Sequence, residues 1–424
     1  MAPPGSLPMP RLPALLIAVL ALVCAVPDAP AEGGLRLEGG ISIGAPPSAA
    51  PPPQPAVRHN PASYARPGPW GRLRKVEIFL EASESVVARF PMPAPQTTWA
   101  IPSTELDAVA ERLAQAGMRA PSIRRLLDPA NRSTDKSLVR LHPLPDEIEQ
   151  LTPQGRARWY AELATYPEND YARTPMVMTL PDPREWFRTS GLRPELLATI
   201  QRLSYPFGEA IAFSDIPLLL GMAESRSEAL AILKAATRTR ALLVKLELDR
   251  SSDLAEILEY WTTGLNLRRK DIEPMLTAIR DVEGAERLDV VHLLPALARK
   301  LLYTYPAPEM ARQGVLPDCH WTSLNFFNSH EDDFLLEDRI AADALVKEFR
   351  AVSPPYRFGD LLLFLNDRGE AVHSAIYLAD DIVFTKNGRN TTRPWILSTL
   401  SDLNGSYLHA SGTRMEGRRR IPAP

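Results

Sequence analysis

The chain has 424 residues, which exceeds the usual size of one hydrophobic core and predicts more than one folded unit together with non-globular segments. Hydrophobic residues make up 45% and charged residues 23%, an ordinary globular balance that excludes wholesale disorder. The net charge of -3 gives no overall cationic field, so nucleic acid is not expected as a partner.

The N-terminus has the pattern of a secretory signal peptide over residues 1–31. Arg11 precedes an apolar run at 12–26, and the small residues Ala29 and Ala31 flank Pro30 before a cleavage point at Glu32. The run is shorter than the roughly 20 residues of a spanning helix, although an uncleaved N-terminal anchor is an alternative. We therefore expect an exported protein, periplasmic or extracellular, with no integral membrane domain after cleavage. Association with the cell envelope is an open alternative to a freely diffusing protein.

The chain contains two cysteines, Cys24 and Cys319. A lipoprotein signal at Cys24 is disfavoured because the bulky Val23 precedes it, so Cys24 is expected to leave with the signal. A single thiol in an exported protein suggests a reactive role or an intermolecular bond, and a buried inert cysteine is the competing interpretation.

Residues 32–70 form a Pro/Ala-rich linker, with Pro51-Pro52-Pro53-Gln54-Pro55 as its densest part. Such composition predicts an extended spacer, and plain disorder is equally compatible.

Residues 71–306 are expected to form a mainly helical domain of unknown function that begins with a small hairpin. The hairpin strands are predicted at 76–80 and 86–90, around Glu84-Ser85. A first helix is predicted to open at Ser103-Thr104-Glu105 and to stop at Gly117, with Leu106, Val109 and Leu113 on its buried face. Apolar periodicity predicts further helices at 152–165, 193–203, 225–248, 253–262, 271–282 and 288–303.

A further helix is predicted to begin at Cys319. Pro317 and Asp318 are helix-start residues, and Trp321 and Leu324 continue the chain at helical spacing. The first turn of a helix favours the thiolate, which is the nucleophilic form of a cysteine.

Downstream of this helix the sequence predicts an antiparallel hairpin. Its strands cover 361–365 and 372–378, with a turn at 366–369. His373, Ala375 and Tyr377 share one face of the second strand. Because Ala375 is small, we expect the cysteine helix to pack on this face and bring the thiol and the imidazole within hydrogen-bond reach as nucleophile and base.

Three motifs in this order resemble the NlpC-type family of papain-like cysteine peptidases, which are cell-wall hydrolases. They are Asp318-Cys319-His320, Gly359-Asp360-Leu361 and the run from His373 to Leu378, and Cys319 precedes His373 by 54 positions. The resemblance covers residues 307–410 and is followed by a basic tail at 411–424. It implies an α+β fold in which the cysteine helix packs on an antiparallel sheet.

The resemblance also implies site residues. Cys319 would be the nucleophile and His373 the base, and the third polar residue would be Thr385 by spacing or Asn387 two positions later, with Asn387 narrowly favoured because an amide suits an imidazole in papain-like sites.

Three further residues are candidates for substrate binding. His320 and Trp321 replace the small residues that usually follow the family's cysteine, and Tyr305 is a loose counterpart of its cleft-lining tyrosine, although packing is its more ordinary role.

The implied reaction is cleavage of a peptide or amide bond, most plausibly in peptidoglycan stem peptides, through an acyl-enzyme. No cofactor or metal is expected, since His320, His330, Glu331 and Asp332 lack the spacing of a known metal site. Two alternatives stay open: a non-catalytic exported binding protein with a degenerate papain-like domain, and a thiol amidase with another substrate.

Overall fold

The computed structural model describes residues 62–89, 91–135, 137–180, 182–262, 269–307, 309–310, 314–408 and 412–422. Contacts divide the chain into two units, Met1–Arg58 and His59–Pro424, and the fold below is that of the second. The expected signal peptide, and the expected linker as far as residue 61, lie outside the described residues. Regular structure begins with strand β1 (Ser63–Tyr64), inside the segment expected to be a linker.

The second unit combines helices with antiparallel sheets, which confirms the α+β class. A four-stranded sheet has the order β1-β2-β9-β10, and a six-stranded sheet has the order β11-β16-β12-β13-β14-β15. Two three-stranded sheets have the orders β3-β5-β4 and β6-β8-β7. Every pairing between these strands is antiparallel.

A predominantly helical region, residues 99–236, surrounds its own apolar core. Its helices are α2 (Leu106–Ala116), α3 (Ala120–Leu127), α4 (Pro145–Gln150), α5 (Pro153–Leu163), α6 (Asp170–Arg173), α7 (Pro183–Trp186), α8 (Pro194–Leu203), α9 (Ile216–Gly221) and α10 (Arg226–Ala236), with short 3-10 turns at Ser103–Glu105 and Pro129–Asn131. Its strands are β3 (Trp99–Pro102), β4 (Arg132–Asp135), β5 (Leu138–Leu141), β6 (Met176–Met178), β7 (Tyr205–Phe207) and β8 (Ala210–Phe213).

Helix α2 forms where the sequence predicted it. Val109 and Leu113 are buried, and Gly117 ends the helix in the left-handed conformation with φ of 109°. A residue with a Cβ would be strained at that φ, so the glycine stops the helix for a local backbone reason.

The predicted N-terminal hairpin is wrong. Strand β2 (Arg72–Leu80) pairs over its whole length with β9 (Thr239–Glu247), and the segment expected to return as a strand contains helix α1 (Glu84–Val87). The helix expected at 225–248 is wrong in its second half for the same reason, since α10 ends at Ala236 and β9 follows. Each of these two segments is a strand because it pairs with the other, which lies far away in the sequence. Local periodicity carries no information about such a distant partner.

Between β9 and the cysteine, the elements whose full bounds fall in the described residues are three helices and one short strand. They are α11 (Leu254–Thr262), α12 (Arg269–Asp281), β10 (Arg287–Asp289) and α13 (Ala296–Leu301), with a 3-10 turn at Val290–Leu293. The helix expected at 288–303 is therefore three shorter elements. None of the helices in the described parts of the chain has the length and apolar character needed to cross a membrane.

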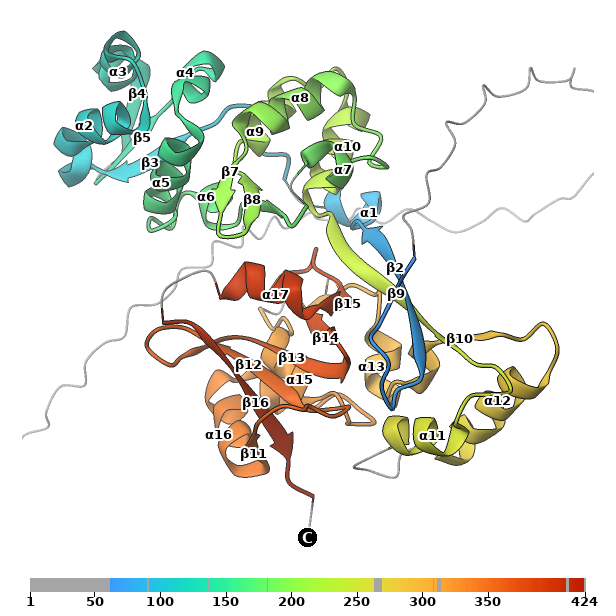
Figure 1. The fold of residues 1–424 in the computed structure, drawn as a ribbon. Helices are drawn as coiled ribbons and strands as arrows, with labels where there is room; N and C mark the ends of the chain where they lie inside the picture. Colours follow the sequence, from blue (N-terminus) through green and yellow to red (C-terminus); the bar gives the residue numbers. More distant parts are fainter. Residues whose placement is uncertain are drawn as a thin grey trace, which may run out of the picture. The chain divides into compact units, whose positions relative to one another are not determined.

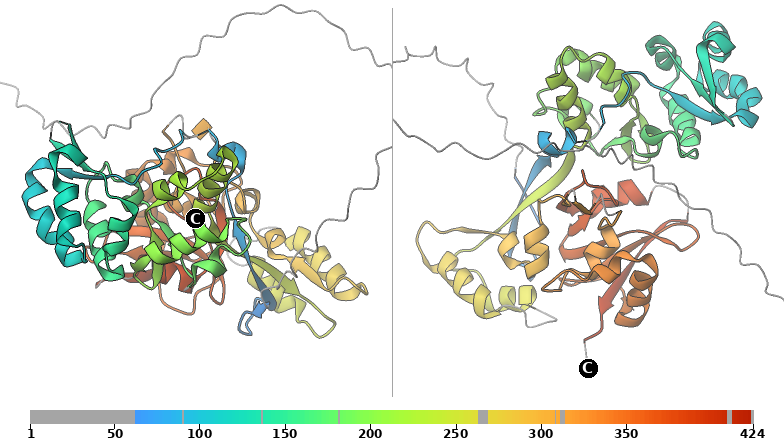
Figure 2. Two further views of the ribbon diagram at one scale, coloured as in Figure 1. Left: turned by 90° about the horizontal axis from the view of Figure 1, so that it is seen from above. Right: turned by 180° about the vertical axis from the view of Figure 1, so that it is seen from behind.

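The six-stranded sheet carries the second and third motifs found in the sequence, and its strands run from orange to red in Figures 1 and 2. The first motif lies at the start of a helix that packs on this sheet. Its strands are β11 (Phe349–Val352), β12 (Leu361–Leu365), β13 (Ala371–Ala379), β14 (Ile382–Lys386), β15 (Trp395–Thr399) and β16 (Arg414–Arg420). Its helices are α15 (Cys319–Leu324), α16 (Asp338–Glu348) and α17 (Leu400–Tyr407), with a 3-10 turn at Asp333–Leu336.

Residues expected to form a basic tail form strand β16 between β11 and β12. Arg419 on this strand donates two hydrogen bonds to the buried Asp360, at 2.6 and 2.7 Å. The preceding Gly359 has φ of 88°, and a Cβ there would lie 2.2 Å from the ring of Phe327. The Gly-Asp pair therefore holds a tight turn and an internal ion pair, and it anchors the last strand of the sheet.

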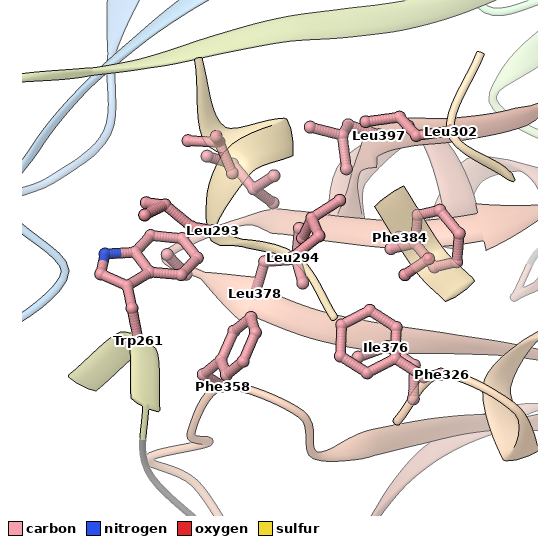
Figure 3. Close-up of a cluster of buried hydrophobic side chains, with 14 of the residues drawn as sticks. Trp261, Leu293, Leu294, Leu302, Phe326, Phe358, Ile376, Leu378, Phe384 and Leu397 are labelled. Carbon is pink, nitrogen blue, oxygen red and sulfur yellow. The ribbon is translucent and has the colours of Figure 1, made fainter. Parts of the chain in front are cut away.

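The two faces of this sheet have different cores. One face packs against α11, α13 and α15, and Figure 3 shows Ile376, Leu378 and Phe384 among its apolar side chains. The opposite face is covered by α17, with Ala375 and Leu403 in a smaller core. Because side chains alternate along a strand, neighbouring residues of β13 belong to different layers.

Candidate active site

The cysteine lies at the start of α15, as the sequence predicted. Asp318 caps this helix, because its Oδ1 accepts a hydrogen bond of 2.9 Å from the backbone N–H of Trp321. Cys319 is a free thiol, and 4% of its surface is exposed. The site therefore has a fixed backbone position for the sulfur but little open surface around it.

An ion pair also fixes the side chain of the capping residue Asp318. Asp318 Oδ2 accepts a hydrogen bond of 2.6 Å from Arg389, which also contacts Asp338 at 2.7 Å. Burial acts to raise the pKa of Asp318, but the Trp321 N–H and the Arg389 guanidinium outweigh it and hold this pKa below its usual value. The carboxylate beside Cys319 thus stays ionised at neutral pH.

His373 is held on β13 by a hydroxyl group. Its Nε2 lies 3.0 Å from Thr385 Oγ1, and the same hydroxyl donates to the carbonyl of Ser374 at 3.0 Å. A threonine hydroxyl has one proton, and the carbonyl accepts it, so Nε2–H must be the donor to Oγ1. In neutral His373 the proton is therefore on Nε2, and Nδ1 keeps its lone pair as the basic nitrogen.

The imidazole ring is also fixed by aromatic neighbours. Tyr407 of α17 stacks on it with ring centroids 4.0 Å apart and planes 6° from parallel, and the ring of Phe364 lies 5.6 Å away. His373 is 1% exposed. The stacking tyrosine was not predicted, because it comes from a helix beyond the hairpin on which the sequence argument rested.

The predicted packing of the cysteine helix is wrong. Ser323 of α15 accepts a hydrogen bond of 3.0 Å from the hydroxyl of Ser374, so α15 lies on the face of Ser374 and not on the face of His373. Trp321 and Leu324 pack into the same large core as Ile376. The larger apolar surface is on this face of the sheet. Burying that surface stabilises the fold more than packing α15 against the small Ala375 on the other face would.

Tyr407 is a shared neighbour of the two candidate catalytic residues. Burial raises the pKa of Tyr407 well above its usual value, and an electrostatic interaction with Cys319 adds to that increase. The phenol thus lies within electrostatic range of the thiol while its ring covers His373. No hydrogen bond between Cys319 and His373 is found among the residues that the structure describes.

A buried lysine lies within electrostatic range of Cys319 and was not predicted from the sequence. Lys386 at the end of β14 is 0% exposed, and its Nζ donates to the carbonyls of Gly388 at 2.6 Å and Asn390 at 2.9 Å. Burial lowers its pKa to about 7, while the nearby Asp318 carboxylate acts in the opposite direction. The sequence signal that could have indicated it is a lysine at the end of the mainly apolar strand Ile382–Lys386.

Of the two candidates for the third polar residue, Thr385 is the one that contacts His373. Thr385 bonds to His373, whereas the narrowly favoured Asn387 makes no hydrogen bond to it in the described chain, and the amide oxygen of Asn387 is buried without a donor. Strand β14 ends at Lys386, so Asn387 no longer follows the alternation on which that preference depended.

Two of the three residues expected at a substrate cleft are packing residues. Trp321 is 1% exposed in the main core. Tyr305 packs against Val87 and Leu230, and burial raises its pKa to about 12. His320 is half-buried, and its Nδ1 has no partner in the described chain. In the described part of the chain, no three His, Cys, Asp or Glu side chains gather as metal ligands.

Comparison with known proteins gives no relative. No family model matches the sequence, and no curated protein or solved structure matches it either. The functional argument therefore depends on the side chains described above.

Proposed function

We propose that the chain is an exported thiol hydrolase of the papain-like NlpC type, which cleaves an amide bond in peptidoglycan stem peptides. Cys319 is the nucleophile and His373 the base. The observation that carries the proposal is the double hydrogen bond of Thr385, which fixes the histidine tautomer with Nδ1 unprotonated. A free cysteine at a capped helix start beside the same sheet supports it.

In the proposed reaction, Nδ1 of His373 takes the proton of the Cys319 thiol as the sulfur attacks the substrate carbonyl carbon. The imidazolium then gives this proton to the leaving amine as the carbon–nitrogen bond breaks, which leaves a thioester on Cys319. A water molecule, deprotonated by Nδ1, hydrolyses the thioester and restores the thiol. Thr385 accepts from Nε2–H throughout and keeps the ring oriented.

This reaction requires a hydrogen bond from the Cys319 sulfur to Nδ1, which the described conformation lacks. Catalytic hydrogen bonds often form only when substrate binds. In our proposal, substrate binding displaces Tyr407 from the imidazole and shifts the start of α15 toward it, because α15 and His373 lie on different faces of the sheet.

One observation favours the second candidate function, an exported binding protein without activity. Cys319 and His373 are 4% and 1% exposed, and a catalytic pair needs access to its substrate. A thiol amidase with a different substrate would share the chemistry of the main proposal and differ only in what it cleaves.

The test is mass spectrometry of purified stem peptides after incubation with the full chain, its Cys319→Ala variant and its Cys24→Ala variant. We expect paired cleavage products with the wild type and Cys24→Ala and none with Cys319→Ala. Cleavage that survives Cys319→Ala would overturn the proposal. Absence of cleavage by a wild type that still reacts with a thiol reagent would move the substrate outside peptidoglycan.

A further inference from the structure

An arginine-rich cavity adjoins the candidate active site. It has a volume of about 430 Å³, which is within the size range of ligand pockets. Tyr407, which stacks on His373, forms part of its wall, and so does the loop at 387–390 that follows β14. A group bound in this cavity would touch the residue that covers the candidate base.

Five arginines line the cavity, against a single acidic residue in the described lining, Asp402. Three of these arginines already have carboxylate partners. Arg238 pairs with Glu81, Arg240 pairs with Glu77 and with Asp402, and Arg389 pairs with Asp318 and Asp338. The one lining carboxylate is therefore already neutralised.

The other two arginines, Arg393 and Arg173, have no carboxylate partner among the described residues. Arg393 is half-buried and donates only to neutral acceptors, the carbonyl of Arg238 at 3.3 Å and the hydroxyl of Thr239 at 3.1 Å. Burial lowers the pKa of Arg393, with only tyrosines acting against this effect. Arg173, at the end of α6, is exposed and makes no side-chain hydrogen bond or ion pair in the described chain.

A guanidinium taken out of water without a counterion is unfavourable, and proteins usually pair such a charge. Its planar N–H groups match the two oxygens of a carboxylate or of a phosphate. Arg393 has this character on the wall of a ligand-sized cavity, and Arg173 supplies a second uncompensated charge there.

We propose that this cavity is an oxyanion subsite, in which Arg393 anchors a carboxylate or phosphate group and Arg173 adds to the attraction. In its role as a substrate subsite, the inference rests on the proposed function and narrows the substrate to one with a negative charge close to the cleaved bond. Anion binding itself requires no turnover, so the two claims can fail separately.

The test is isothermal titration calorimetry on the full-length Cys319→Ala chain at low ionic strength. The probes are inorganic phosphate, the dipeptide alanyl-alanine with a free carboxylate, and the same dipeptide as its C-terminal amide. We expect saturable binding of at least one anion and none of the amide. Preference for the dipeptide acid would identify a peptide carboxylate as the ligand, and preference for phosphate would identify a phosphate ester.

Three variants locate the site. Arg393→Gln should weaken anion binding by about tenfold or more, because a charge-assisted hydrogen bond is lost. Arg173→Gln, which removes an exposed side chain with no hydrogen bond or ion pair to the described residues, should weaken it by about threefold. Arg339→Gln removes an exposed arginine outside the cavity and should leave binding unchanged. Equal binding by Arg173→Gln, Arg393→Gln and the parent chain, or no anion binding by the parent chain, would overturn the proposal.

Discussion

The two faces of the six-stranded sheet separate the groups that the proposed chemistry must join. The face toward α15 carries Ser374 and Lys386 and the large apolar core, whereas the face toward α17 carries His373, Thr385 and a small core. The thiol and the imidazole are thus supplied by different layers. This difference shows that a sequence motif gives the order of two candidate catalytic residues along the chain. It does not determine on which face of the sheet each of them lies.

The largest expected effect tests the α15 face through Lys386. Its pKa is about 7 in the folded chain, below the ordinary 10.5, so between these values the unfolded chain binds a proton that the folded chain does not. Stability from this group is therefore full above pH 10.5 and is lost as the pH falls through 7. From pH 7 to 9, the free energy of unfolding of the wild type minus that of Lys386→Met should rise by up to about 3 kcal/mol.

Urea titrations at pH 6, 7, 8 and 9 measure this difference. Lys347→Met, which removes an exposed lysine, is the matched control and should give a flat difference. A flat curve for Lys386→Met as well would mean that Lys386 is not buried against this core.

The next effect tests the α17 face through Thr385. Thr385→Val removes the acceptor of the His373 Nε2–H and frees the ring to adopt the other tautomer, so kcat/KM on a stem peptide should fall by about 10- to 100-fold. Thr385→Ser keeps the hydroxyl and should retain most of the activity. Full activity in Thr385→Val, which keeps the methyl group but lacks the hydroxyl, would show that the hydrogen bond to His373 is not needed.

The smallest effect tests the contact of α15 with the sheet. Ser323→Ala or Ser374→Ala leaves one buried hydroxyl without its partner and should cost about 1 kcal/mol of unfolding free energy. The double variant removes both hydroxyls and should cost less than the sum of the single variants. If the two single changes in unfolding free energy add up to that of the double variant in urea denaturation, the two hydroxyls do not interact. The contact of α15 with β13 would then be contradicted.

Local signals predicted the parts of this sheet that depend on nearby residues. The start of α15 at Cys319, the β12–β13 pair and the alternation along β13 follow from a cap, a turn and period-two patterning, which act over a few residues. Thr385 and Asn387 were both predicted as candidates for the contact with His373. Because β14 ends at Lys386, only Thr385 keeps the strand alternation that points it toward the imidazole.

Longer-range features could not be predicted in this way. The pairing of β2 with β9 joins residues more than 150 positions apart. Strand β16 lies in a segment that was expected to be a tail because it is basic. The layer chosen by α15 and the stacking of Tyr407 depend on which apolar surfaces can be buried together. A single sequence gives the composition of those surfaces but not their pairing.

The most direct test of the central claim is the rate at which a stem peptide carrying a C-terminal chloromethyl ketone, which occupies the site as it reacts, alkylates Cys319 at pH 6, followed by mass spectrometry of the peptide that contains it. If His373 activates the thiol, the folded wild type should react faster than the same chain unfolded in urea, and His373→Gln should lose this advantage. A folded wild type that reacts no faster than the unfolded chain, or an unchanged rate in His373→Gln, would contradict the account.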